Sequence, residues 1–368
     1  EANEEKSAML TTVEYRIGNE SQPAVRTTPE ASDTQRFLRE AISQDCDMAV
    51  METSSQALHL RRCDGLKFKV AVFTNLTRDH LDYHHTMENY FDAKKELVDV
   101  RIGEAPNASV INIDDKCGLK LADELKNSGQ KVVTFAQNCA ADLTATNIDV
   151  SLVEGTSFLL KTPDGEKQIT SPLVGKPHVY NMLSATGTAL ELGYDLDSIQ
   201  KGLETCIGAP GRFERVPHER DFAVVVDYAH SDDALLNTLK TARELTDGRI
   251  ITVFGCGGDR DKTKRPKMAH IASQLSNQAI FTSDNPRTEN SQTIIDEMEE
   301  GVSAENYKKT LSILDRRQAI KTACKLAVTG DIILIAGKGH ENYQEINGVK
   351  NHFDDLEEVM NCFNQLKK

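Results

Sequence analysis

The sequence predicts an α/β protein of two domains: a first domain with a mostly parallel sheet flanked by helices, and a Rossmann-like, doubly wound C-terminal domain. Three observations predict this fold class. Short apolar runs alternate with helical segments in the first third of the chain, antiparallel strands are indicated over 145–173, and strand–loop–helix units repeat after residue 222. A chain of 368 residues is long enough to bury two hydrophobic cores.

In the first domain, segment 30–46 has the apolar spacing of a helix and acidic residues near its start. Segment 117–129 has the same helical character. Short runs rich in Val, Met and Ile, bounded by polar loops, are typical of buried parallel strands. Four such runs are present, at 48–53, 70–76, 108–115 and 131–138.

Segment 145–173 differs, because apolar and polar residues alternate around a "TPDGE" turn, which favours antiparallel strands. Segment 178–193 returns to a helical pattern, with Gly193 as the expected C-cap. Segment 206–216 then carries two Gly and a Pro within four residues and is typical of a linker. We therefore expect domains at 1–208 and 209–368.

After this linker the pattern is regular, and it predicts a parallel, doubly wound sheet. Four loops each follow a predicted strand: "DYAHSDD", "GCGGDRDKTKR", "SDNPRTEN" and "AGKGHEN". Ligands bind at the carboxyl ends of the strands in such sheets. The loops could be ordinary polar turns, but charged residues and Gly after four strands favour a site for an anionic small molecule.

Composition excludes some classes of function. The chain has 57 acidic and 43 basic residues, a formal charge of −14, which disfavours a broad nucleic-acid-binding surface. Eight Cys without a CxxC pair predict free thiols in a reducing compartment. No run of eighteen apolar residues is present, so we expect a soluble, intracellular protein with no membrane partner.

Segment 73–97 gathers three His, three Asp and a Lys pair, which suggests a metal site. His80 and His84 have the i, i+4 spacing of helical zinc ligands, but Leu81 stands where a zinc hydrolase needs Glu. Glu52, which follows a predicted strand, with neighbouring Asp residues and one His fits Mg²⁺ better. A solvated loop Glu is the alternative. Mg²⁺ in turn suggests phosphate chemistry.

The glycine-rich loop "GCGGDRDKTKR" lets the backbone approach an anion that Arg and Lys complement, although a Gly turn before a basic helix start is the alternative. The dinucleotide pattern GxGxxG and the phosphate-loop pattern GxxxxGK[ST] are both absent from this sequence. From the residues alone, we therefore expect a two-domain α/β protein with an anionic-ligand cleft linked to Mg²⁺.

Read together, the segments resemble the Mur ligases, in particular those that add the third residue of the peptidoglycan peptide. The resemblance runs from about Ala8 to the C-terminus. It is carried, in order, by "TNLTRDHLDYHHTMENYFDAK", "VYNMLSATGTAL", "PGRFERV", "VDYAHSDDAL", "GCGGDRDKTKRP", "SDNPRTE" and "AGKGHENYQ". It implies ATP and Mg²⁺ as cofactors, with UDP-MurNAc-L-Ala-D-Glu and meso-diaminopimelate as substrates. The D-glutamate carboxylate would be phosphorylated, and an amine would then displace the phosphate.

The resemblance also implies roles for individual residues. The catalytic and metal-binding set is Glu52, His80 and Lys94, the last as a carbamate. The set that binds the UDP-sugar-peptide is Thr27, Thr28, Ser54 and Arg62. The set that binds ATP is Asn181, Arg212, Asp227 and His230. The set that binds diaminopimelate is Arg260, Asp284, Asn285, Pro286, Arg287, Gly337 and Glu341. The "DNPR" form accompanies diaminopimelate because a guanidinium can pair bidentately with its second carboxylate.

The family's N-terminal UDP-binding domain and "GTNGKT" phosphate loop are not in this sequence, so we expect the chain alone to be inactive without that region. Smaller departures from the family are Gln56, Leu60, His85 and His178. An alternative function is a catalytically inactive structural component, as in plastid relatives within a transcription complex, although a scaffold needs no carboxylate-pairing pocket. Folylpolyglutamate or cyanophycin synthetase-like chemistry is disfavoured by "DNPR" with "GKGHE". We expect a monomer in the cytoplasm, or in the plastid stroma for a plastid relative.

Overall fold

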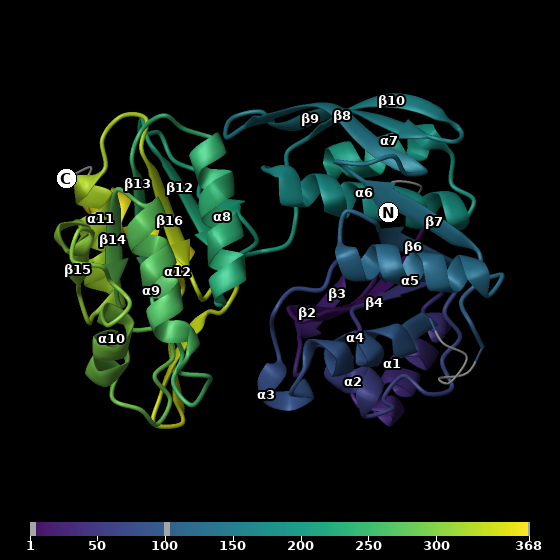
Figure 1. Ribbon diagram of the computed structural model, residues 1–368, viewed down its shortest axis with the longest axis horizontal. Coiled ribbons are helices and arrows are strands. Elements are labelled where there is room, and N and C mark those ends of the chain that lie inside the picture. Colours follow the sequence, from purple (N-terminus) through teal and green to yellow (C-terminus); the bar gives the residue numbers. More distant parts are fainter. Residues whose placement is uncertain (1–4, 99–103, 367–368) are drawn as a thin grey trace. The chain divides into compact units, whose positions relative to one another are not determined.

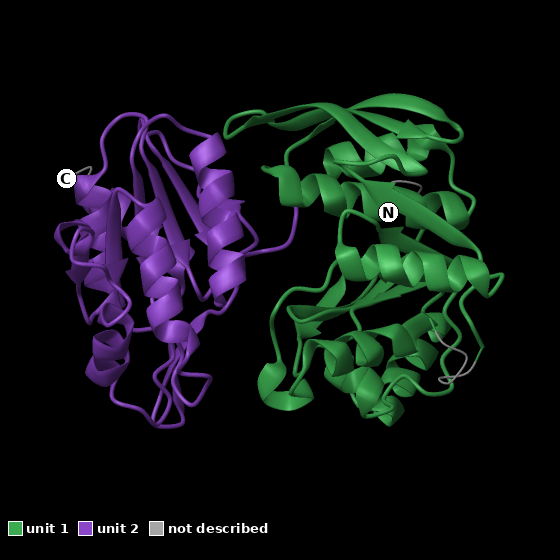
Figure 2. Cartoon of the chain, in the orientation of Figure 1, with its two compact units in different colours: residues 1–207 green, residues 208–368 purple. Residues whose placement is uncertain are grey.

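The computed structural model describes residues 5–98 and 104–366, and its chain forms two compact units (Figures 1 and 2). Unit 1 is Glu1–Ile207 and unit 2 is Gly208–Lys368. The division falls inside segment 206–216, where Gly and Pro predicted a linker. No helix in the described ranges is long and apolar enough to cross a membrane.

Unit 1 begins with a four-stranded sheet of order β3-β2-β1-β4. Its strands are β1 Ser7–Leu10, β2 Glu14–Ile17, β3 Glu20–Pro23 and β4 Met48–Met51. Helix α1, Ala31–Ser43, buries Phe37 and Ala41 against Leu10 of β1. Strand β4 is parallel to β1, as predicted, but the predicted burial is wrong, because β4 is an edge strand and Val50 is 58% exposed.

The larger sheet of unit 1 has the order β10-β9-β8-β7-β6-β5. Its strands are β5 Val70–Phe73, β6 Ala108–Asn112, β7 Val132–Ala136, β8 Leu143–Ser151, β9 Gly155–Thr162 and β10 Gly165–Ser171. Strands β5 to β8 are parallel, and β8, β9 and β10 form an antiparallel meander. The parallel strands were predicted from short apolar runs, and the antiparallel strands from the alternation of apolar and polar residues.

Helices cover both faces of this sheet. Those that pack on it are α4 Met87–Lys95, α5 Lys116–Asn127, α6 Lys176–Glu191 and α7 Leu196–Thr205, while α2 Ser55–His59 and α3 Leu81–His84 pack against α4. Helices α6 and α7 pack with Val110 and Phe135, whereas α4 and α5 pack with Phe73 and Ile111. Neighbouring residues of β6 thus face opposite layers, as strand geometry requires. Gly193 has φ +93° one position after the C-cap of α6.

Unit 2 is a six-stranded sheet of order β11-β12-β16-β13-β14-β15, parallel except for β11. Its strands are β11 Glu214–Arg215, β12 Ala223–Asp227, β13 Ile250–Phe254, β14 Gln278–Phe281, β15 Thr310–Ser312 and β16 Ile332–Ala336. Its helices are α8 Asp232–Glu244, α9 Lys264–Leu275, α10 Ser291–Glu299, α11 Arg316–Leu326 and α12 Asp355–Leu366.

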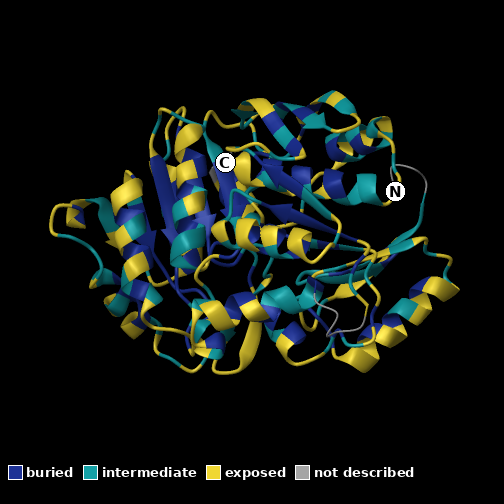
Figure 3. Cartoon of the chain, turned by 45° about the vertical axis from the view of Figure 1, so that its right-hand side comes forward, coloured by how far each residue is buried: buried dark blue, intermediate teal, exposed yellow. Residues whose placement is uncertain are grey.

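The core of unit 2 lies on the two central strands, β13 and β16, in which every residue is buried (Figure 3). Strands β12, β16, β13 and β14 run parallel, so their following loops emerge at one edge of the sheet, as predicted. The loop after β16 ends in a β-hairpin that the sequence did not predict. The hairpin consists of β17, Tyr343–Ile346, and β18, Val349–His352.

Candidate active site

The turn after β4 in unit 1 brings together three residues that were assigned to substrate or metal binding, Thr28, Glu52 and Ser54. The buried Thr28 hydroxyl donates to the Glu52 carbonyl (2.9 Å) and accepts from the Ser54 N–H (2.9 Å). The Ser54 hydroxyl caps α2 by accepting from the Ala57 N–H. The Glu52 carboxylate accepts from the Thr12 N–H (2.9 Å) and hydroxyl (2.8 Å). Thr28 therefore fixes the turn, while Glu52 stays exposed.

Arg62 lies against the same turn. Its Nη1 donates to the Thr28 carbonyl (3.4 Å), and its Nη2 pairs with Glu30 (3.0 Å). Its Nε is buried and, among the described residues, has no hydrogen-bond partner. The hydroxyls of Thr27 and Thr12 share a hydrogen bond (3.0 Å), and this contact links Thr27 to the cluster. The four residues assigned to the UDP-sugar-peptide thus share one corner of unit 1, with a buried guanidinium N–H still unsatisfied.

Lys94 lies on the last turn of α4, with its ammonium group 5.3 Å from the centre of the Tyr90 ring. Burial lowers the pKa of Lys94, and the carboxylates of Glu52 and Asp79 partly oppose that effect. Glu52 and Lys94, which are 42 positions apart in sequence, are therefore electrostatic neighbours. A lysine with a lowered pKa carries more neutral amine, the form that reacts with CO₂ to give a carbamate.

The two histidines with helical spacing have different surroundings. His80 lies outside the helix, in a left-handed conformation at the N-cap of α3, and its ring lies 5.9 Å from Tyr90. His84 shares a hydrogen bond with the buried Ser55 (2.9 Å), and burial lowers its pKa. Among the described residues, no three His, Cys, Asp or Glu side chains form a metal-binding group. The predicted metal ligands Glu52 and His80 therefore do not form such a group by themselves, and a carbamate on Lys94 would add oxygen ligands beside Glu52.

Asn181, assigned to ATP, lies exposed on the second turn of α6. The start of this helix is held by Asp114, which follows β6. The Asp114 carboxylate accepts hydrogen bonds from the Tyr180 hydroxyl (2.8 Å) and from the backbone N–H groups of Gln137 (2.6 Å) and Asn138 (3.0 Å). Its pKa is lowered, because these donors outweigh its burial. Nothing in the sequence singles out Asp114, because the partners of its carboxylate are distant in sequence.

In unit 2, the residues assigned to ATP surround Tyr228, at the end of β12. The Arg212 guanidinium lies 4.9 Å from the centre of the Tyr228 ring, and the His230 ring lies 4.6 Å from it. The Asp227 carboxylate accepts from the backbone N–H groups of Phe213 (2.7 Å) and Ala229 (2.8 Å), although burial raises its pKa overall. Arg212, Asp227 and His230 thus form one cluster, in which Asp227 fixes the backbone.

Among the residues assigned to diaminopimelate, Asn285 connects two loops through the hydrogen bonds of its side chain. Its Oδ1 accepts from Lys338 Nζ (3.1 Å) and from the Glu345 N–H (2.9 Å), and its Nδ2 donates to Glu341 (2.7 Å). Burial raises the pKa of Glu341, and the carboxylate of Asp284 adds to that effect. The side chain of Asn285 therefore ties the loop after β14 to the loop after β16.

Gly337 is required where these loops meet. It has φ +111°, and a Cβ there would lie 2.7 Å from Oδ2 of Asp284. Gly258 leaves room in the same way for Pro286, since its Cβ would lie 1.9 Å from the Pro286 carbonyl oxygen. A side chain at Gly337 would push apart the loops after β14 and β16, and one at Gly258 would push apart the loops after β13 and β14.

The two arginines of this pocket differ in their surroundings. Arg287 has an 81% buried side chain, and its Nη1 donates to the Gly258 carbonyl (2.8 Å). Arg260 is exposed, and its Nη1 donates to the Asp259 carbonyl (3.0 Å). The structure therefore brings together Asp284, Asn285, Pro286, Arg287, Gly337 and Glu341, while Arg260 lies exposed at the end of the neighbouring loop after β13.

Two residues of this pocket were not predicted. Lys338 is fully buried and lies 3.6 Å from Glu341, so it balances the carboxylates around it. A lysine in a "GKG" turn is normally exposed, and no signal in the sequence indicated its burial. Glu345 lies 3.6 Å from Arg287 Nε. Tyr343 and Glu345 lie two residues apart on β17, which pairs with β18. This strand pattern is the one sequence signal that could have indicated Glu345.

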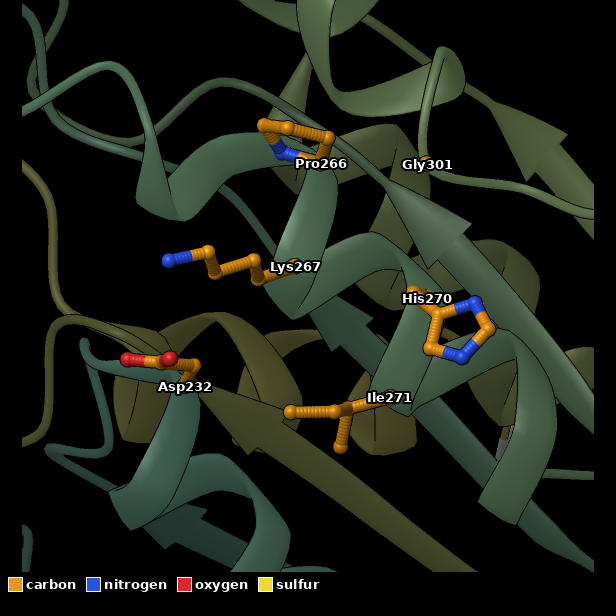
Figure 4. Close-up of a pocket in the computed structure, with 6 residues that line it drawn as sticks. All are labelled: Asp232, Pro266, Lys267, His270, Ile271 and Gly301. Carbon is orange, nitrogen blue, oxygen red and sulfur yellow. The ribbon is translucent and has the colours of Figure 1, made fainter.

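Unit 2 also has a recess of about 430 Å³, which lies apart from the residues predicted to bind substrates, ATP or a metal ion (Figure 4). This recess lies between the start of α8 and the outer side of α9, and it is lined by Asp232, Pro266, Lys267, His270, Ile271 and Gly301. None of the residues assigned to the substrates, ATP or a metal ion lines it.

Comparison with known proteins identifies the class to which this architecture belongs. Residues 1–189 match the Mur ligase middle domain, and residues 211–339 match the Mur ligase glutamate ligase domain. The chain is 44% identical, over 98% of its length and 73% of the relative's, to UDP-N-acetylmuramoyl-L-alanyl-D-glutamate–2,6-diaminopimelate ligase of Geobacter metallireducens. The corresponding ligase of Bacillus velezensis is 45% identical, over 99% of this chain and 74% of the relative.

The solved structure of a ligase with the same name has 37% identity and a TM-score of 0.70, and it covers all of this chain and 74% of its own. Folylpolyglutamate synthase of Mycobacterium tuberculosis has a TM-score of 0.70 at 17% identity, covering 91% of this chain and 83% of its own, and shares the fold alone. Fold and site thus define a two-unit ATP-dependent ligase. The chain belongs to the Mur ligase family.

Proposed function

We propose that this protein joins meso-diaminopimelate to the D-glutamate carboxylate of UDP-MurNAc-L-Ala-D-Glu, with hydrolysis of ATP to ADP and phosphate. The observation that carries the proposal is the mostly buried Arg287 beside Asp284, Asn285 and Glu341. Its guanidinium can pair with a second carboxylate, which diaminopimelate has and lysine lacks. The printed names of the 44% and 45% identical relatives support the same reaction.

The chemistry requires activation, because a carboxylate is a poor acyl donor. A carboxylate oxygen attacks the γ-phosphorus of ATP, ADP leaves, and an acyl phosphate forms. The neutral amine of the amino acid then attacks the acyl carbon and forms a tetrahedral intermediate. Collapse of that intermediate expels phosphate and, after loss of a proton from nitrogen, leaves an amide.

In unit 1, we assign Thr27, Ser54 and Arg62 to binding the UDP-sugar-peptide. The buried, unsatisfied Arg62 Nε–H supports this role, because a ligand oxygen would satisfy it. Thr28 would act through the backbone, by fixing the turn that carries Glu52 and Ser54.

The residues present fit Mg²⁺. Glu52 offers exposed oxygens, His80 offers a ring nitrogen, and Lys94 would offer carbamate oxygens, a set dominated by hard ligands. When bound, the ion would neutralise charge between a phosphate and a carboxylate. We assign Asn181 of unit 1, and Arg212, Asp227 and His230 of unit 2, to ATP. The stacking of Arg212 on Tyr228 supports that assignment, since it gives a cation beside an aromatic surface.

A direct test uses the full-length protein, with the N-terminal region that activity is expected to require, and measures phosphate release from ATP with UDP-MurNAc-L-Ala-D-Glu and either meso-diaminopimelate or L-lysine. We expect turnover with diaminopimelate and little with lysine. Arg287→Ala should lower kcat/KM for diaminopimelate by about a hundredfold, with the KM for ATP changed by less than about threefold. Equal losses for both substrates would contradict the assigned pocket, and preference for lysine would contradict the proposed substrate.

Calorimetric titration of this chain with meso-diaminopimelate, with L-lysine as the control, tests the pocket separately from turnover. The relatives are named as ligases, and no observation on the structure favours a non-catalytic role. Because the reaction consumes ATP, which cells keep inside the cytoplasm, we infer that the reaction occurs there. The monomeric state stays a prediction, which sedimentation equilibrium would test.

A further inference from the structure

The hairpin β17–β18 holds the backbone of Arg287 in an unusual conformation. Arg287 has φ +51°, a left-handed conformation that residues other than Gly rarely adopt. Two backbone hydrogen bonds fix it, from the Arg287 N–H to the Glu345 carbonyl (3.0 Å) and from the Asn347 N–H to the Arg287 carbonyl (2.7 Å). The loop after β14 is thus attached to the turn of a hairpin about sixty residues further along the chain.

Glu345 also contacts the side chain of Arg287. Its carboxylate lies 3.6 Å from Nε, while Nη1 donates to the Gly258 carbonyl (2.8 Å). Among the described residues, none accepts a hydrogen bond from Nη2. The guanidinium is therefore held along its Nε edge, and its Nη2 end is left for a ligand. The side chains of Arg287 and Glu345 are only 19% and 25% exposed, so water screens this pair less than a surface pair.

The position of Glu345 is itself fixed by the pocket. Its N–H donates to Oδ1 of Asn285 (2.9 Å), whose Nδ2 donates to Glu341 (2.7 Å). Glu345 also pairs across the hairpin with Lys350, which lies over the ring of Tyr343. A displacement of Glu345 would therefore disturb Asn285 and Arg287 together. A long Arg side chain without such a partner would lose rotamer freedom each time it bound a ligand.

We propose that Glu345 is a positioning residue that fixes the guanidinium of Arg287 to receive the second carboxylate of the amino-acid substrate. The inference rests on the proposed function and deepens it. Glu345 acts on the Nε edge, so it does not compete with a ligand for Nη2. Its removal should therefore weaken the use of a dicarboxylic amino acid, not strengthen it.

A double-mutant cycle tests this role in the full chain. The variants are Glu345→Gln, Arg287→Ala and the double variant, and Glu300→Gln, an exposed carboxylate at the end of α10, is the matched control. We expect Glu345→Gln to lower kcat/KM for meso-diaminopimelate by about tenfold, with the KM for ATP unchanged. If Glu345 acts through Arg287, the double variant should be no worse than Arg287→Ala alone. Additive losses, an unchanged kcat/KM or an increased one would overturn the proposal.

A second substrate separates positioning from direct contact. L-2-Aminopimelate has the distal carboxylate of meso-diaminopimelate but lacks its distal ammonium group. We expect Glu345→Gln to lower kcat/KM for both by the same factor, because both depend on Arg287. A loss confined to meso-diaminopimelate would show that Glu345 binds the ammonium group itself, which overturns the positioning role. Failure of the unsubstituted protein to use meso-diaminopimelate would instead defeat the proposed function, and the inference with it.

Discussion

Lys94 and Lys338 have the same side chain, and their surroundings give them different properties. Burial lowers the pKa of Lys94, beside the carboxylates of Glu52 and Asp79. Lys338 is fully buried and is held by Asn285 (3.1 Å) and Glu341 (3.6 Å). Lys94 is therefore suited to react as a neutral amine, whereas Lys338 is suited to hold two pocket residues in place.

The lowered pKa of Lys94 predicts carbamylation near neutral pH. The neutral amine is the reactive form, so a lower pKa makes more of it available at a given pH, and the carbamate should grow as pH rises through that pKa. In ¹³C-bicarbonate, we expect a carbamate resonance in the NMR spectrum that disappears in Lys94→Arg and persists in Lys95→Arg. Lys95 is the matched control because Glu124 pairs with it. A spectrum identical in wild type and Lys94→Arg would contradict the prediction.

Glu289 predicts a pH dependence of stability. Hydrogen bonds from the buried Arg265 lower the pKa of Glu289 to about 2, from an ordinary value of 4.5. Because the pKa of Glu289 is lower in the folded state than in the unfolded state, its ionised form stabilises the fold at pH values above the unfolded-state pKa. That stabilisation is lost as the pH falls through the folded-state pKa. The difference in unfolding free energy between wild type and Glu289→Gln should therefore be full at neutral pH and shrink between about pH 4.5 and about pH 2. Urea denaturation across that range measures it, and a difference independent of pH would contradict the assignment.

At the scale of elements, α11 and α12 are joined by a fully buried ion pair. Arg316 contacts both oxygens of Asp355 (2.7 and 2.6 Å), and neither side chain is exposed. Arg316 also donates to the Ala336 carbonyl at the end of β16 (3.0 Å), directly before Gly337. The pair thus fixes the C-terminal helix and the strand that presents Gly337 in one arrangement.

Breaking this pair should be costly, because a buried charge would lose its partner. Asp355→Ala is expected to lower the unfolding free energy of unit 2 by about 3–5 kcal/mol. Glu358→Ala is the matched control. It leaves Arg317, whose side chain is 59% exposed, without this ion-pair partner, and should cost less than about 1 kcal/mol. Similar losses in the two variants, measured by urea denaturation, would show that burial does not set the strength of these pairs.

At the scale of the whole molecule, the two units have separate hydrophobic cores. Val110, Phe135 and Leu183 belong to a core of unit 1, whereas Val253 and Ile335 belong to that of unit 2. The connection between the units lies in segment 206–216, where Ile207 is 91% exposed. Units with their own cores and an exposed connection are expected to fold independently.

This independence predicts two unfolding transitions in differential scanning calorimetry. The fragment 208–368 should fold alone and melt at the temperature of one of them. Asp355→Ala should lower that transition only, because Arg316 and Asp355 both lie in unit 2. A single transition that Asp355→Ala lowers as a whole would indicate that the two units unfold together.

Much of the fold could be predicted from the sequence, because its signals are local. The apolar runs of β5, β6 and β7 and the strand–loop–helix units of unit 2 lie at their predicted places. The parallel direction of β12, β13, β14 and β16 was also predicted, and it gathers four ligand-type loops at one edge, whereas the strand order was not predicted. The burial of β4 was predicted wrongly, since an apolar run does not reveal whether its strand lies at a sheet edge.

The sequence by itself determined the order of elements, the linker and the motifs that resemble the Mur ligases, because each of these is written in neighbouring residues. The tertiary structure alone decided which side chains meet. It buried Lys338 beside Asn285, placed the Thr28 hydroxyl against the Glu52 carbonyl, and placed Glu345 on the Nε edge of Arg287. These contacts join segments as much as 58 residues apart (287 to 345), and sequence periodicity carries no information about pairing over that distance.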